Sequence, residues 1–90
     1  MKSPRRPIGG GVAKQFAQAA AIQGQVKRER ERHQNKVASL SEQRAALLGV
    51  ADPALRAAKM AKVRHDEIEE NQRYKAKIDD LLRRAREVWR

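Results

Sequence analysis

The sequence predicts an all-α protein, a long antiparallel two-helix hairpin of coiled-coil type preceded by an extended basic N-terminal arm. Apolar side chains recur at helical spacing over residues 12–48 and again over residues 53–89, and one strong turn signal separates the two segments. The two apolar stripes also match each other when the chain folds back at that signal. We therefore expect an arm at 1–11, a helix at 12–48, a turn at 49–52 and a helix at 53–89.

The first eleven residues, MKSPRRPIGGG, predict the arm. Two prolines disfavour a helix and three glycines add freedom, which would leave Lys2, Arg5 and Arg6 able to reach a partner. Residues 1–26 contain no acid, and the amphipathic pattern that follows leaves a mitochondrial targeting segment open as an alternative. The single serine and the early glycine cluster count against that alternative.

The first predicted helix rests on a stripe that is roughly 140° wide at about 100° per residue. The stripe holds Val12, Phe16, Ala19, Ile22, Val26, Val37, Leu40, Leu47 and Leu48. Its phase is constant, which indicates one continuous helix. Ser39 and Glu42 have the spacing of a capping box, so a break near Ala38 is the alternative.

The segment GVADPA predicts the turn. Gly49 suits the C-terminal cap of the first helix, Asp52 the N-cap of the second, and Pro53 its first position. The second stripe consists of Met60, Val63, Tyr74, Ile78, Leu81, Leu82, Ala85, Val88 and Trp89.

When the chain folds back at this turn, a residue of one helix lies beside a residue of the other at the same position along the hairpin axis if their numbers add to about 101. The stripes then meet along their length, and Trp89 either closes the open end over Val12 or anchors a partner. The predicted hairpin core consists of Phe16, Ile22, Val26, Val37, Leu40, Met60, Val63, Tyr74, Ile78, Leu82 and Trp89.

Two polar interruptions, KRERERHQNK at 27–36 and RHDEIEENQR at 64–73, face each other in this arrangement. We expect interhelix ion pairs that join Arg30 to Glu70 and His33 to Glu67. Such pairs fix register more than they stabilise, because desolvation offsets much of the attraction. Arg44 falls opposite Arg56, and both are expected to turn outward.

The hairpin has few large side chains for its length. Fifteen of the thirty-six hydrophobic residues in the chain are alanine, so a chain of this size is expected to fold against partners. Small residues on each helix would let another protein subunit approach closely, although alanine also simply favours helix. These faces consist of Ala13, Ala17, Ala20 and Gly24 on the first helix and Ala54, Ala57, Ala58 and Ala61 on the second.

The net positive charge is concentrated in the N-terminal part of the chain. The net charge is +10, of which residues 1–36 carry +7, while residues 66–90 are neutral. This imbalance favours a polyanionic partner such as RNA, contacted through its phosphates. No stacking aromatic is expected beside these charges, which argues against a single-strand binding module. The candidate nucleic-acid-binding residues are Lys2, Arg5, Arg6, Lys14, Lys27, Arg28, Arg32 and Lys36.

Catalytic and metal-binding patterns are weak. The chain has no cysteine, its serines have no positioned base, and GGG lacks the rest of a phosphate-binding loop. His65 and Glu69 have the spacing of a helical ion pair, and no third ligand accompanies them. We expect no enzyme activity, cofactor, metal or small-molecule substrate. No apolar run reaches the roughly 20 residues of a membrane span.

These patterns predict a structural subunit of a large ribonucleoprotein, ribosome-like, with the arm and first helix on RNA. The alternative is a subunit of a protein-only complex, such as an organellar respiratory assembly or a virus particle, that packs through its alanine faces. A third hypothesis is a small helical regulator of an acidic protein. An intracellular location is expected, with the mitochondrial matrix as one possibility.

Overall fold

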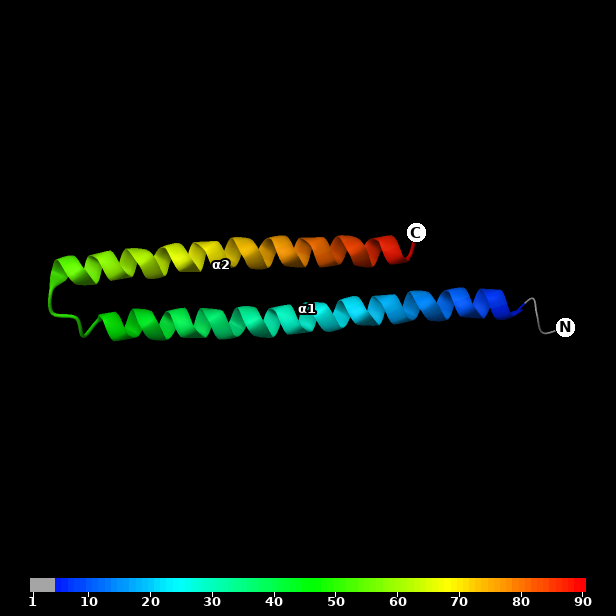
Figure 1. The fold of residues 1–90 in the computed structure, drawn as a ribbon, viewed down its shortest axis with the longest axis horizontal. Helices are drawn as coiled ribbons and strands as arrows, with labels where there is room; N and C mark the ends of the chain where they lie inside the picture. The colour runs from blue at the N-terminus through cyan, green and yellow to red at the C-terminus, as the bar shows by residue number, and fades with distance from the viewer. Residues whose placement is uncertain (1–4) are drawn as a thin grey trace.

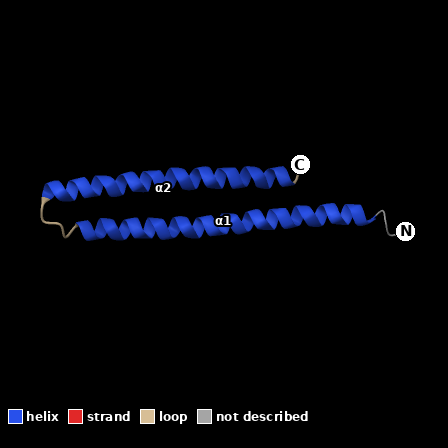
Figure 2. Cartoon of the chain, in the orientation of Figure 1, coloured by secondary structure: helices blue, strands red, loops and turns tan. Residues whose placement is uncertain are grey.

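Two helices lie side by side and antiparallel in the computed structural model, which describes residues 5–90 (Figure 1). Helix α1 spans Arg5–Leu47 and helix α2 spans Pro53–Val88, joined by a turn at 48–52 (Figure 2). The chain measures 80 × 17 × 8 Å along its principal axes, so it is a slab two helices wide and one helix thick. The predicted all-α hairpin is confirmed.

Helix α1 starts at Arg5, seven residues before the predicted start at Val12. Pro7 is compatible with this start because it is the third residue of the helix, where the backbone N–H has no intrahelical acceptor. The structure thus differs from the predicted extended arm over residues 5–11. Residues 1–4 lie outside the described residues. The N-terminal end of α1 extends past the C-terminal end of α2 (Figure 1).

Helix α1 runs through Ala38 without the break that the capping-box spacing left open. Ser39 does not cap a new helix there. Its hydroxyl accepts a hydrogen bond of 3.5 Å from Gln43, one turn later in the same helix. The continuous helix keeps the basic segment 27–36 and the apolar residues near the turn on one rigid element.

The turn forms largely as predicted. Asp52 has extended backbone angles, its Oδ1 accepts the Ala54 N–H at 3.0 Å, and Pro53 begins α2. Gly49 differs from its predicted role, because no described residue has a positive φ. Helix α1 instead ends through three successive i→i−3 hydrogen bonds, the last from Val50 N–H to the Leu47 carbonyl at 3.1 Å. Arg56 ties the turn to α2 by donating to the Val50 carbonyl at 3.1 Å.

Most buried and half-buried residues of each helix are separated by alternating steps of three and four. This 3.5-residue period is typical of coiled-coil packing, in which the repeating positions form a seam that faces the partner helix. On α1 the seam contains Gln15, Ala19, Ile22, Val26, Glu29, His33, Leu40 and Leu47. On α2 it contains Arg56, Met60, Val63, Glu67, Glu70, Tyr74, Leu81 and Val88.

Two interhelix ion pairs in the middle of the hairpin join residues whose numbers add to 103 and 102, not to the expected 101. His33 contacts Glu70, and Glu29 contacts Arg73. Helical side chains lean toward the N-terminus of their helix and cover the surface about one position earlier. In an antiparallel pair the two leans add, which raises the sum by about two. The partner of each side chain is therefore displaced by about two residues from the one that a sum of 101 assigns.

The core is small and only partly as predicted. Leu40 and Val63 are buried, and they pack with Leu47, Val50 and Met60 near the turn. Five other predicted core residues are half-buried, namely Ile22, Val26, Met60, Tyr74 and Ile78.

Four predicted core residues are exposed instead: Phe16, Val37, Leu82 and Trp89. Leu81 takes the fully buried position that was assigned to Leu82. The prediction used about 100° per residue, and a straight helix drifts by about 20° per heptad from a 3.5-residue seam. Over five heptads this drift carries real seam residues to the edge of the predicted stripe and brings exposed residues into it.

Candidate nucleic-acid interface

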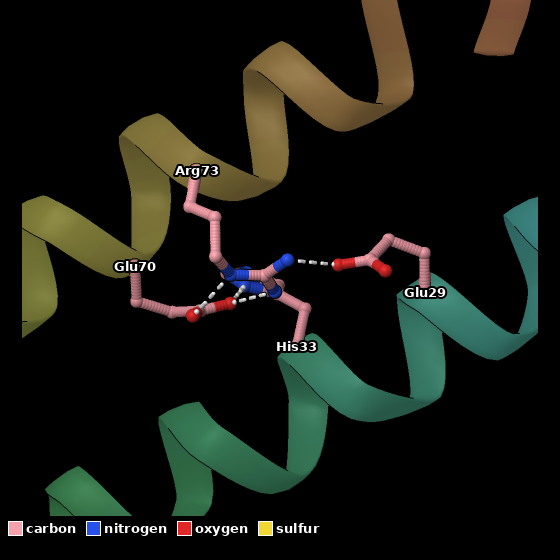
Figure 3. Close-up of polar contacts among 4 residues, drawn as sticks. All are labelled: Glu29, His33, Glu70 and Arg73. Carbon is pink, nitrogen blue, oxygen red and sulfur yellow. Dashed lines mark hydrogen bonds and ion pairs between the residues drawn. The ribbon is translucent and has the colours of Figure 1, made fainter. Parts of the chain in front are cut away.

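Four polar residues fill the middle of the seam, where each helix interrupts its apolar pattern (Figure 3). His33 Nδ1 lies 2.8 Å from Glu70 Oε2. Arg73 donates from Nε and Nη2 to the two oxygens of Glu70, at 2.9 and 2.8 Å, and from Nη1 to Glu29. We call Glu29, His33, Glu70 and Arg73 the polar cluster. Both carboxylates are buried, and the cluster links α1 to α2 at two points.

The environment of the cluster favours the charged forms of Glu70 and Arg73. Hydrogen bonds from Arg73, with a smaller contribution from His33, lower the pKa of Glu70 from 4.5 to about 2, although burial acts in the opposite direction. The two carboxylates in turn raise the pKa of Arg73. The His33 ring stacks on Tyr74 with centroids 3.9 Å apart and planes 9° apart, which fixes its orientation. Among the described residues, no buried side-chain nitrogen or oxygen lacks a hydrogen-bond partner.

The observed ion pairs differ from the predicted ones in their partners. Glu70 pairs with His33 and Arg73, and Glu67 pairs with Arg44. Arg30 is exposed and forms no ion pair within the described part of the chain, so its predicted interhelix role is corrected. The Arg44–Glu67 pair, together with the Arg56 bond to the turn, also removes the expected juxtaposition of Arg44 and Arg56.

Glu29 and Arg73 were not predicted from the sequence, although a signal for Glu29 was present. Ala19, Val26, His33, Leu40 and Leu47 follow one another at intervals of seven, which defines a coiled-coil phase. In that phase the residue three after Val26 is Glu29, and Arg30 lies outside the seam. Arg73 had no such signal, because it flanks the seam of α2 and reaches in with a long side chain.

The predicted phosphate contacts on α1 are exposed wherever the structure describes them. Lys14, Lys27, Arg28, Arg32 and Lys36 are all exposed, and none forms an ion pair among the described residues. Arg30 joins this set. Lys2 lies outside the described residues, and so do the side chains of Arg5 and Arg6.

The basic residues of α1 do not all lie in one environment. Arg28 and Arg32 line a surface groove with Gln25, Glu29 and Lys77, in which basic side chains predominate. Lys36 lines a different groove, beside Asp66, Glu69 and Glu70. Arg28 and Arg32 are therefore better placed than Lys36 to meet an anion.

The aromatic side chains at the open end are more exposed than expected. Trp89 packs edge to face against Phe16, with centroids 5.3 Å apart, and 51% of Trp89 remains exposed. Val12 is also exposed, so Trp89 does not close the hairpin over it. The expected burial of Trp89 on the inward stripe is corrected, whereas Tyr74 is half-buried against His33.

Other chemistry is sparse in the described residues. His65 and Glu69 form the expected exposed i,i+4 pair at 3.1 Å, and no described group of three His, Cys, Asp or Glu side chains could hold a metal ion. Neither helix of the described chain is long and apolar enough to cross a membrane. The geometry defines a helical hairpin with a polar seam and a basic surface on α1. Comparison with protein-family models, curated proteins and solved structures finds no match.

Proposed function

We propose that this protein is a non-enzymatic structural subunit of a ribonucleoprotein that binds RNA phosphates through the basic residues of α1. The observation that carries the proposal is the difference between the two helices in how their cations are neutralised. On α2, four exposed cations each pair with an acid three or four residues away, namely Lys62, Lys75, Arg83 and Arg84, and four exposed cations form no ion pair among the described residues, namely Lys59, Arg64, Lys77 and Arg86. On α1 between residues 14 and 36, six exposed Lys and Arg side chains have no such partner among the described residues.

Unpaired cations on a rigid helix suit a phosphate backbone. The six residues are distributed over about 33 Å of helix axis, at 1.5 Å per residue. Each phosphate that they neutralise releases condensed counterions, which provides affinity without reading sequence. Lys14, Lys27, Arg28, Arg30, Arg32 and Lys36 would therefore position the hairpin on RNA.

The thin core supports a role inside an assembly. Of the large hydrophobic side chains described, only Leu40, Leu47, Val63 and Leu81 are buried. A hairpin with so small a core gains stability when a second surface covers it.

A protein-only assembly is the second candidate, and the alanine residues favour it. Ala13, Ala17 and Ala20 on α1 are exposed, as are the four predicted alanines of α2. Small exposed residues permit close approach of another helix. This candidate predicts association that survives high salt.

The test is the salt dependence of binding to a fluorescein-labelled RNA hairpin, followed by anisotropy. With six phosphate contacts, affinity should fall about a thousandfold between about 50 and 200 mM salt. Replacing Arg28 and Arg32 by Gln should weaken binding about 25-fold near 100 mM salt and reduce the slope of log affinity against log salt by about 1.5.

The matched control replaces Lys62 and Arg83 by Gln, which removes the same net charge from residues that already pair with Asp66 and Asp80. Its affinity should stay within about threefold of the native value. An equal loss in both double variants would reduce the effect to net charge and contradict a defined interface. Affinity that is insensitive to salt would contradict phosphate binding altogether.

A further inference from the structure

Because the hairpin is one helix thick, it presents two broad faces, one on each side of the seam. On α1, one face contains two series of residues spaced at intervals of seven. The first series runs from Ala13 to Leu48, and the second runs from Phe16 to Arg44. On α2, the same face contains the residues that follow Ala54 and Ala57 at intervals of seven. Residues flanking a seam on corresponding sides share a face in an antiparallel pair, and the Phe16–Trp89 contact joins the two helices there.

This face carries no acid, although the chain has eleven Asp and Glu residues. The acids lie in the seam, on the outer edges, in the turn and on the opposite face, where the grooves lined by Arg28 and by Lys36 also lie. We call it the acid-free face. Its basic residues are Lys27, Arg30, Arg44, Arg64 and Lys75. Arg44 and Lys75 pair with acids that lie off this face, Glu67 and Asp79, and all five remain exposed.

Exposed apolar side chains concentrate on the same face. Eight large hydrophobic residues are exposed in the described chain, and six of them lie on the acid-free face. These six are Phe16, Val37, Leu48, Ile68, Leu82 and Trp89. Basic and apolar residues alternate along its length, with the aromatic pair at the open end. An exposed apolar surface of this kind marks an interaction site.

The partner of this face must be anionic and must also accept apolar side chains. RNA phosphates satisfy the cations but offer nothing to Leu82 or Ile68. A second copy would place five basic residues against five others. A single partner helix that packs along the line between α1 and α2 would not contact the outer shoulders of the face, which lie farther from the seam. These shoulders contain Leu48, Ile68, Leu82 and Trp89.

We propose that the acid-free face lies flat on an anionic lipid bilayer. Such a surface meets both requirements, since apolar and aromatic side chains enter the headgroup region while Lys and Arg meet anionic headgroups. The flat slab, 17 Å wide, brings both shoulders into contact at once. RNA binding through Arg28 and Arg32 uses the opposite face, whereas Lys27 and Arg30 belong to both proposed surfaces.

Trp89 provides the assay, because it is the only tryptophan in the chain and lies on the proposed contact surface. The full chain is titrated with vesicles of phosphatidylcholine containing about one-third phosphatidylglycerol, and with vesicles of phosphatidylcholine alone. We expect the Trp89 emission to shift to the blue with the anionic vesicles only. Each basic residue at an anionic surface raises partitioning by about fivefold, so replacing Lys27 and Arg30 by Gln should lower it about 25-fold.

Two matched controls isolate the face. Replacing Lys59 and Lys62 by Gln removes the same charge from the opposite face and should change partitioning by less than about threefold. Ile68 is 51% exposed on the acid-free face, and its replacement by Gln should weaken partitioning about tenfold. Leu55 is 46% exposed on the opposite face, and its replacement by Gln should not weaken partitioning. Glutamine favours helix, so all variants should keep native helicity by circular dichroism.

Three results would overturn the proposal. The first is the absence of any Trp89 shift or co-sedimentation with anionic vesicles. The second is equal loss of partitioning in the Lys27/Arg30 and Lys59/Lys62 variants, which would indicate attraction by net charge alone. The third is a Trp89 shift that appears without lipid when the protein concentration is raised, which would assign the face to a second copy.

Discussion

Glu70 is the residue on which the polar contacts between the helices converge. Its two carboxylate oxygens accept hydrogen bonds from Arg73, and His33 lies 2.8 Å from one of them. A buried carboxylate is costly unless it is paired and hydrogen-bonded, and here all of its partners are present. Tyr74 holds His33 in place by stacking, so the geometry of the site is fixed from both helices.

The lowered pKa of Glu70 predicts a specific loss of stability in acid. The carboxyl group titrates near 4.5 in the unfolded chain and near 2 in the folded one, so the unfolded state binds more protons between these values. Unfolding free energy should therefore fall as the pH falls from about 4.5 toward 2. At neutral pH the contribution should be about 2 kcal/mol, since solvent reaches Arg73 from one side.

Chemical unfolding of the native chain and of the Glu70→Gln variant across this pH range checks the prediction. The difference in unfolding free energy between them should be present at pH 7 and shrink as the pH falls, because glutamine does not titrate. Parallel curves for the two proteins would show that Glu70 is not the group responsible.

At the scale of the helices, the polar cluster determines which residues face each other. Apolar contacts near the turn involve only Leu40, Leu47 and Val63 with their neighbours, and such contacts tolerate sliding. The cluster does not, because a shift of one residue would leave buried charges unpaired. The polar residues of the two interruptions therefore determine the register of the hairpin.

A pair of substitutions tests which arginine holds the helices together. Replacing Arg73 by Gln leaves Glu29 and Glu70 buried without their main partner and should lower the unfolding free energy by about 2 kcal/mol. Replacing Arg30 by Gln, which removes an exposed and unpaired side chain, should change it by less than about 0.5 kcal/mol. Urea unfolding followed by circular dichroism gives both values. A larger loss in the Arg30 variant would restore the pairing that helical periodicity predicted.

The hairpin itself was predictable because Asp52 and Pro53 give an unambiguous helix start and the two apolar stripes match in length. The identity of the contacting side chains was less predictable from the sequence. A stripe drawn at 100° per residue favours Arg30 over Glu29 and cannot separate Leu81 from Leu82, since the coiled-coil seam drifts from it. The helical state of residues 5–11 was missed because proline and glycine were weighed without regard to the position of Pro7 in the first turn.

The whole molecule is a thin rod with chemically different sides. Ion pairs within α2 neutralise many of its charges, while α1 keeps six exposed cations unpaired among the described residues. A rod of 80 Å with so few buried side chains is consistent with the proposed role of joining parts of an assembly. The unpaired charge on α1 is what favours RNA as one of those parts.

Purification of the full chain in gentle salt, from the cells that make it, tests the ribonucleoprotein proposal when its companions are identified before and after nuclease treatment. We expect RNA to co-purify with the chain and nuclease to release the protein companions. If the same set of proteins remains bound after nuclease and in high salt, the ribonucleoprotein proposal is contradicted, and the hairpin joins protein subunits through its own surfaces.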